Sequence, residues 1–311
     1  MTMISKRRLF GSLAPLALLL AGPAIAQNAA PAPAAAAVAA PAVDADPALW
    51  VVKDDDTTIY LFGTVHVLKP GLRWFDKAVK AAFDKSDQVV LEIPLPSDAE
   101  AQQVLLPRVI DPDGPALTEK LHPEKRAAYA AVLAKLGIPP TALDKLYPWF
   151  AAVTLTQVQL QKAGYNPASG AERAIDAAAK AAGKPVTGLE TLTQQIGYFA
   201  DLPEADQIAF LEEGVDDFDD GIKSIDEMVS SWSKGDPETL GKVMNRDIDK
   251  LPSLYKVLLK DRNIRWADWI GARMKQPGTV FIAVGAGHLA GKDSVQVQLA
   301  THHLTATRIP N

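Results

Sequence analysis

The pattern of apolar and polar positions over the first part of the chain predicts two strands, a helix and a third strand. Leu49–Lys53 and Thr58–Val67 are rich in β-branched and aromatic residues, and the three aspartates between them favour a hairpin. Lys77–Lys85 has helical spacing, and Gln88–Ile93 is a continuous apolar run typical of a strand buried on both faces. This order predicts a βαβ unit within an α/β sheet.

The middle of the chain, about Asp98 to Arg273, has helical patterns punctuated by proline and glycine. One predicted strand, Pro185–Leu189, interrupts it and follows a predicted helix at Ala171–Ala182. We therefore expect a large helical insertion at about 98–273 that contributes one strand of its own to the sheet.

The last part of the chain returns to the strand pattern. Thr279–Val284 is apolar, a helix is expected from about Lys292, and a final strand is expected near Leu304–Ile309. The sequence thus predicts a single α/β domain over 47–311, with a central mixed sheet that the N- and C-terminal segments share.

The first residues have the pattern of an export signal. A basic segment at 6–8, an apolar segment at 9–20 and the small-x-small motif Ala24-Ile25-Ala26 predict a signal peptide over 1–26. The apolar segment is shorter than the ~20 residues that a spanning helix needs, so no integral membrane segment is expected after cleavage. The Ala/Pro-rich stretch 27–46 predicts a disordered linker. We expect a periplasmic or secreted protein, exported by either the Sec or the twin-arginine route.

Composition narrows the possible chemistry. The chain has no cysteine, so any bound metal would be held by His, Asp or Glu. Its formal net charge is −5 and it has no basic stripe, which argues against a nucleic-acid partner.

The pattern Gly-x-x-His occurs twice, each time at the end of a predicted strand. The copies are Gly63-Thr64-Val65-His66 and Gly285-Ala286-Gly287-His288, and the whole chain has five histidines. Imidazole is a common metal ligand and general base near neutral pH. A single histidine at a strand end usually has a structural role, but two in matching settings favour one shared functional site.

Two carboxylates, Glu92 and Glu190, also follow predicted strands, and ligand sites of open α/β sheets lie at the carboxyl ends of the strands. Glu92 lies in an apolar run, so its carboxylate should meet a cation, a metal or a donor, and a structural ion pair would serve equally well. Glu190 also fits a simple role at a helix N-terminus. Arg262 and Asn263 lie on an amphipathic helix, where Arg262 could bind a carboxylate or form an ordinary ion pair.

Taken together, these residues resemble the TraB/GumN family, which includes the Tiki proteases, and the exported form resembles its bacterial GumN-like branch. The similarity extends over nearly the whole mature chain. The similar segments are Leu61-Phe62-Gly63-Thr64-Val65-His66, Leu91-Glu92, Gly188-Leu189-Glu190-Thr191, Trp232-Ser233-Lys234-Gly235-Asp236, Arg262-Asn263 and Ala283-Val284-Gly285-Ala286-Gly287-His288-Leu289.

The resemblance implies an α/β fold related to erythromycin-esterase-like and haem-binding ChaN-like proteins. It also implies a divalent-metal site with His66 and His288 as ligands and Glu92 as a ligand or general base. Arg262 and Asn263 would be pocket residues.

The leading hypothesis is an exported divalent-metal-dependent hydrolase, with a peptidase as the favoured activity and a peptide or a small molecule as the substrate. The metal would be Mn, Co or Zn, all of which accept nitrogen and oxygen ligands. Glu92 or Glu190 would accept the proton of the attacking water, and Arg262 or the Gly285–Gly287 turn would stabilise the oxyanion. The alternatives are a non-catalytic binding protein of the envelope and an accessory factor in polysaccharide or pheromone processing.

Overall fold

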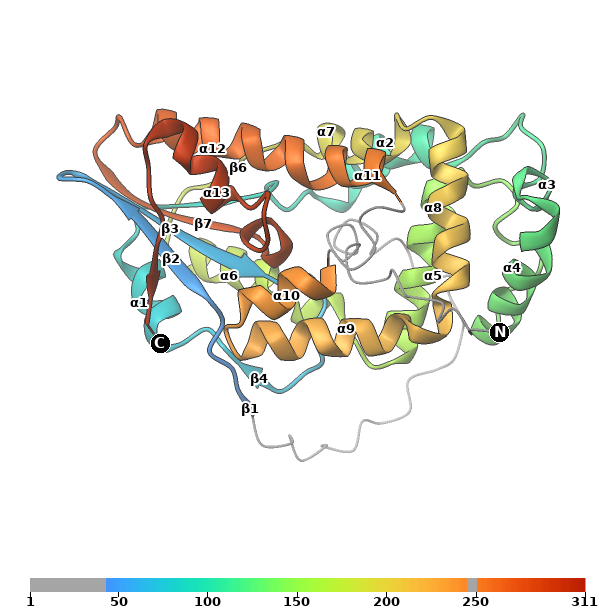
Figure 1. The fold of residues 1–311 in the computed structure, drawn as a ribbon, viewed down its shortest axis with the longest axis horizontal. Coiled ribbons are helices and arrows are strands. Elements are labelled where there is room, and N and C mark those ends of the chain that lie inside the picture. The colour runs from blue at the N-terminus through green and yellow to red at the C-terminus, as the bar shows by residue number, and fades with distance from the viewer. Residues whose placement is uncertain (1–42, 245–250, 311) are drawn as a thin grey trace, which may run out of the picture.

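The structure is a computed structural model that describes residues 43–244 and 251–310 (Figure 1). The predicted signal peptide and most of the predicted linker lie outside the described residues. Among the helices of the described part, none is long and apolar enough to cross a membrane.

A six-stranded mixed sheet lies at the centre of the fold, with the strand order β6-β5-β7-β3-β2-β8. Strands β6, β5, β7 and β3 run parallel, whereas β2 runs antiparallel to both β3 and β8. The strands are β2 (Leu49–Lys53), β3 (Thr57–Thr64), β5 (Gln88–Leu91), β6 (Val186–Gly188), β7 (Gly278–Gly285) and β8 (Thr307–Ile309).

Strand β7 joins the two ends of the chain because it pairs with β3 on one side and β5 on the other. The register places Gly63 opposite Val284 and Thr64 opposite Gly285. The two Gly-x-x-His segments therefore leave the same edge of the sheet from neighbouring strands. The predicted α/β class and the shared sheet are confirmed.

Helices cover both faces of this sheet, because successive residues of a strand point to opposite sides. Leu91 packs into a cluster with residues of α6 and α9, and its neighbour Val90 packs into a second cluster with Trp266 and Ile270 of α12. Figure 1 shows α9 and α12 on opposite sides of the strands.

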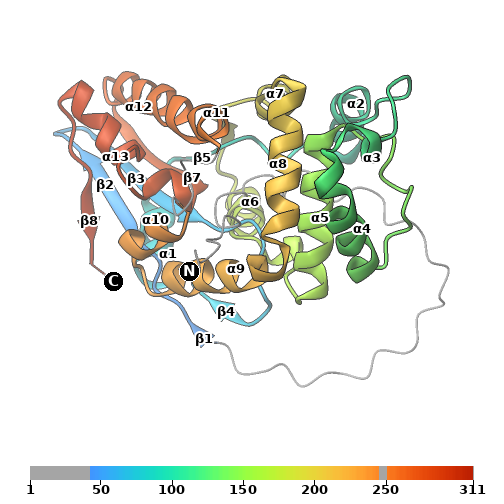
Figure 2. The ribbon, with the colours of Figure 1, turned by 45° about the vertical axis from the view of Figure 1, so that its right-hand side comes forward.

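A third apolar cluster lies beside the sheet, within the helical insertion. It is formed by residues of α2, α4, α5, α7 and α8, with Trp149 and Leu211 fully buried at its centre. Figure 2 shows these helices as a bundle to one side of the sheet.

The structure has the following helices: α1 (Lys77–Lys85), α2 (Asp98–Val109), α3 (Leu117–Lys120), α4 (Pro123–Leu136), α5 (Pro148–Lys162), α6 (Ala171–Ala181), α7 (Leu192–Ala200), α8 (Glu204–Asp216), α9 (Phe218–Ser233), α10 (Pro237–Met244), α11 (Pro252–Tyr255), α12 (Asp261–Arg273) and α13 (Val295–Gln298), with a π-helical turn η4 (Lys256–Lys260) and 3-10 turns η3 (Pro167–Ser169), η5 (Ala286–Leu289) and η6 (Leu299–His302).

Three local expectations differ from the structure. The helix expected from about Lys292 consists of two short elements, α13 and η6, and begins at Val295. The strand expected at Thr58–Val67 is β3, which ends at Thr64, so His66 lies in the bend that follows the strand. Strand β1 (Val43–Asp44) lies inside the segment predicted as linker, because backbone hydrogen bonds pair it with β4 (Leu72–Arg73).

Candidate functional site

Four predicted site residues lie at the carboxyl edge of the parallel strands. His66 follows β3, Glu92 directly follows β5, Glu190 follows β6, and His288 lies in η5 after β7. All four are buried, with exposed fractions of 4, 4, 6 and 1%. Four strand ends from distant parts of the sequence thus bring two imidazoles and two carboxylates into one buried region.

The guanidinium of Arg262 joins most of these groups. It makes a two-pronged ion pair with Glu190, from Nε to Oε1 and from Nη2 to Oε2, both at 2.9 Å. Nη2 also donates to Glu92 Oε2 at 2.5 Å, and Nη1 lies 3.2 Å from the carbonyl oxygen of Leu258 and 3.1 Å from His288 Nε2. A guanidinium has five N–H groups, so no donor of Arg262 is left for an oxyanion in this arrangement.

A π-helical turn directly precedes Arg262 and Asn263 within the helix that carries them. Helix α11, η4 and α12 form one continuous helix, in which the backbone N–H of Asp261 donates to Lys256 five residues earlier. Such a bulge changes the register of the side chains that follow it and occurs frequently at functional sites. Here Arg262 and Asn263 face the strand ends, and Asn263 Nδ2 is fixed by the carbonyl oxygen of Asp293 at 2.7 Å.

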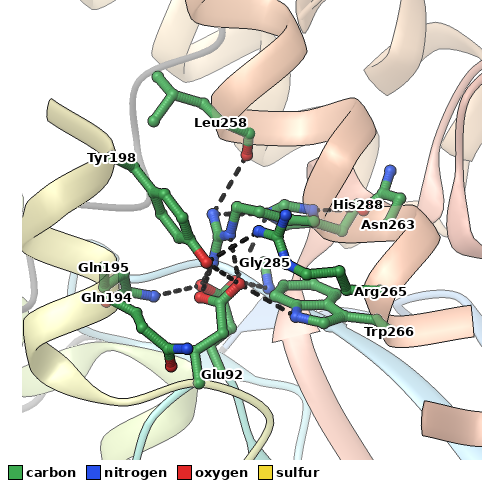
Figure 3. A network of polar contacts seen from close by, with 12 residues as sticks. Glu92, Gln194, Gln195, Tyr198, Leu258, Asn263, Arg265, Trp266, Gly285 and His288 are labelled. Atoms are coloured by element: carbon green, nitrogen blue, oxygen red, sulfur yellow. Dashed lines mark hydrogen bonds and ion pairs between the residues drawn. The ribbon is translucent and has the colours of Figure 1, made fainter. Parts of the chain in front are cut away.

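Glu92 is held as an anion by donors from three elements. Gly285 N donates to Oε1 at 2.7 Å, and Gln195 Nε2 donates to Oε2 at 2.8 Å beside the Arg262 contact. Burial alone raises the pKa of Glu92, but the charge of Arg262 and the other donors outweigh it and bring the pKa to about 2. Figure 3 shows Gln195, Gly285 and His288 converging on this carboxylate.

His288 has both ring nitrogens engaged. Nδ1 lies 2.6 Å from Asn263 Oδ1, and Nε2 lies 3.1 Å from Arg262 Nη1. Since Arg262 can only donate, Nε2 accepts and the proton resides on Nδ1, which makes the ring neutral. Burial, with the charge of Arg262, accordingly lowers the pKa of His288 to about 3.

His66 has a different environment. Its Nδ1 lies 2.6 Å from Glu172 Oε1. The two groups form an ion pair, but their geometry is not that of a hydrogen bond. Its Nε2 is buried and has no hydrogen-bond partner among the described residues. Burial works to lower the pKa of His66, but the charge and the contact of Glu172 outweigh it, and the pKa is raised.

Gly285 forms a corner between these groups. A Cβ at this position would stand 3.0 Å from Glu92 Oε1, and 3.6 Å from both His66 Nε2 and His288 Cδ2. The absence of a side chain therefore lets the unpartnered nitrogen of His66 face the carboxylate of Glu92 across the glycine. We call this space the Gly285 corner.

The expected metal-ligand set of His66, His288 and Glu92 does not fit a single ion in this arrangement. His288 has no nitrogen lone pair left, because Nε2 accepts from the Arg262 cation and Nδ1 carries the proton. Within 43–244 and 251–310, no group of three or more His, Asp or Glu side chains is placed to hold a metal ion. Glu92 Oε1 and His66 Nε2 are the two potential ligand atoms among the three atoms nearest to the Gly285 corner.

Several residues of the site were not predicted as such. Glu172 lies in the first turn of α6 and Trp266 on α12, where each also fits an ordinary role in its helix. Yet Glu172 contacts His66, and Trp266 Nε1 donates to Glu190 Oε1 at 3.1 Å, as does the hydroxyl of Tyr198. Glu190 itself does not cap α7, since the side chain of Thr191 does. The signal that could have found Tyr198 is its position two turns after Glu190 on the helix that begins there.

The fold and the cluster define an α/β protein with a buried polar centre at the carboxyl ends of its parallel strands. Residues 48–308 match the model of the TraB/PrgY/gumN family, so the chain belongs to this family. No curated protein and no solved structure matches the chain.

Proposed function

We propose that this chain is a hydrolase whose reaction centre is His66 at the Gly285 corner. The observation that carries the proposal is the pairing on one buried ring: Glu172 holds Nδ1, and Nε2 has no partner among the described residues. A histidine oriented by a carboxylate on one nitrogen, with the other facing a site, is the arrangement of a general base.

The other titratable groups are less suited to proton transfer. Glu92 has a pKa of about 2 and accepts three hydrogen bonds, so it is a weak base. Glu190 accepts from Arg262 through both oxygens and from Tyr198 and Trp266 as well. His288 is held neutral between Asn263 and Arg262.

In the proposed reaction, a water molecule at the Gly285 corner attacks a carbonyl carbon of the substrate. His66 Nε2 takes the proton of the water as the new C–O bond forms, and returns it to the leaving nitrogen or oxygen as the old bond breaks. Glu172 and the ionised Glu92 stabilise the imidazolium formed in between. Family membership makes a peptide bond the first substrate to test.

The proposed reaction does not use the divalent ion that the family resemblance implies. To bridge both histidines, an ion would need His288 Nε2, and Arg262 would first have to leave that nitrogen. Metal analysis of the purified protein, followed by chelation and by addition of Mn, Co or Zn, tests this point. We expect activity to persist after chelation.

The central test is a screen of the purified protein against peptide and ester libraries, followed by His66→Gln in the same assays. We expect kcat/KM of the wild type to rise with pH as His66 loses its proton, and His66→Gln to lower kcat/KM by about 10²–10⁴-fold. The matched control is His122→Gln, because His122 is an exposed histidine that also pairs with a glutamate, Glu212, away from the cluster.

Two results would contradict the proposal. One is full activity in His66→Gln. The other is a ligand that raises the melting temperature of the wild type without any turnover, since that outcome identifies a binding protein of the envelope instead.

A further inference from the structure

A surface groove lies beside the buried cluster, between α7 and the continuous helix α11–η4–α12. Its volume is about 770 Å³, and α2 and α8 also contribute to its walls. Its charged lining side chains are Arg108, Asp201, Asp206 and Arg265, and Tyr198 also lines it. The groove is therefore large enough for several residues of an extended peptide.

Tyr198 connects this groove to the site. Its hydroxyl donates to Glu190 Oε1 at 3.1 Å on the buried side and accepts from Arg265 Nη2 at 2.8 Å on the groove side. The centroid of the Tyr198 ring lies 5.3 Å from the guanidinium carbon of Arg262 and 5.4 Å from that of Arg265. Figure 3 shows Tyr198 and Arg265 next to the cluster.

Arg265 is exposed and lines the groove. Within 43–244 and 251–310 it forms no ion pair with a carboxylate, and its Nη2 donates to the Tyr198 hydroxyl. By contrast, Arg108 on the other wall faces Asp201 at 3.7 Å. The N–H groups of Arg265 that do not contact Tyr198 are therefore available to bind an anionic ligand.

We propose that this groove is a substrate subsite that binds the terminal carboxylate of a peptide through Arg265. A guanidinium offers two parallel N–H groups that match a carboxylate, and the hydrogen bond to the Tyr198 hydroxyl holds the Arg265 side chain at the groove. The Tyr198–Glu190–Arg262 chain of contacts then sets the bound peptide beside the cluster. The choice of a peptide rests on the proposed hydrolase function, whereas the recognition of a carboxylate rests on the groove alone.

Binding is measured by calorimetry on the full chain with His66→Gln, so that turnover plays no part. The probes are N-acetyl-tetra-alanine with a free terminal carboxylate and the same peptide as its terminal amide, which differ in a single charge. We expect the carboxylate to bind at least about tenfold more tightly than the amide, and Arg265→Gln to remove this difference.

Arg273→Gln is the matched control, because Arg273 lies on the same helix outside the groove, and it should keep the tenfold preference. Arg265→Lys, which keeps the charge but not the paired N–H groups, should keep only part of it. Equal binding of the two probes, no binding of either, or a preference that survives Arg265→Gln would overturn the subsite. Because catalysis is not measured, none of these results depends on whether the chain is a hydrolase.

Discussion

The two Gly-x-x-His segments have the same pattern and neighbouring places in the sheet, yet their histidines are in opposite chemical states. His66 has one nitrogen on a carboxylate and one without a partner, and its pKa is raised. His288 donates from Nδ1 to Asn263 and accepts at Nε2 from Arg262, with Glu92 Oε1 farther away at 3.8 Å, and its pKa is lowered to about 3.

The difference lies in what faces each ring from outside its own strand. Glu172 comes to His66 from α6, whereas Asn263 and Arg262 come to His288 from α12. The motif fixes the position of an imidazole, and the helices packed against it determine which of its nitrogen atoms have partners.

Replacing Arg262 should have the largest effect on stability, because its charge is buried with Glu92 and Glu190. Its contact with Nε2 of His288 also makes the environments of the two histidines different. Arg262→Met leaves Glu92 and Glu190 buried without their ion-pair partner, and we expect a loss of about 3–5 kcal/mol in the free energy of unfolding. Urea unfolding measures this loss, and Arg265→Met, which removes an exposed guanidinium of the same helix, should stay within about 0.5 kcal/mol of the wild type.

If Arg262 makes His288 different, the pKa of His288 should also rise in Arg262→Met, which NMR of the ring protons measures. Arg262→Lys provides the same measurement if the methionine variant does not fold. An unchanged pKa in both variants would show that burial alone accounts for the state of His288.

Removing the partner of His288 should have a smaller effect. Asn263→Leu leaves the Nδ1–H of His288 and the carbonyl oxygen of Asp293 without their buried partner, which costs about 1–3 kcal/mol. Thermal or urea unfolding measures it, with Gln296→Leu as a control, since Gln296 also donates to a backbone carbonyl oxygen but lies outside the cluster. A loss equal to that of the control would mean that Asn263 does not hold His288.

The pH dependence of stability should show both histidines with opposite signs. The folded pKa of His66 is above its usual 6.5, so its contribution is complete below pH 6.5 and is lost as pH rises through the folded value. The folded pKa of His288 is about 3, so its contribution is present above pH 6.5 and is lost as pH falls towards 3. Each slope is at most about 1.4 kcal/mol per pH unit.

Urea unfolding of the wild type and of Glu172→Gln between pH 5 and 9 separates the two contributions. Glu172 is the main factor that raises the pKa of His66, so the decline in stability above pH 6.5 should disappear in Glu172→Gln. The change below pH 6.5 should remain, because Glu172 does not set the pKa of His288. Parallel curves above pH 6.5 would rule out the assignment of that slope to His66.

The sequence was sufficient for the sheet and for the edge at which the site lies. The apolar runs of β3, β5 and β7 are local signals, and glycine marks the point where two of them end. Parallel strands then bring His66, Glu92 and His288 to one edge without any further information.

The partners of these residues could not be predicted in the same way. Glutamate is favourable in the first turn of a helix, and this accounts for Glu172 without any other partner. The amino-acid pattern therefore does not predict its contact with His66. The π-helical turn before Arg262 is equally hidden, because its five residues read as ordinary helix. Both Glu172 and this π-helical turn determine which nitrogen lone pairs of the two histidines are occupied. Those lone pairs can therefore be identified only from the three-dimensional structure.

The position of β7 has a consequence for how the protein is made. It is the last long strand to be synthesised, yet it lies in the middle of the sheet, between two strands from the first third of the chain. Until it is inserted, β3 and β5 have no common neighbour, and contacts so distant in sequence form slowly. A nascent or truncated chain that ends before Gly278 should therefore not assemble the sheet and should have no activity, however well its helices form.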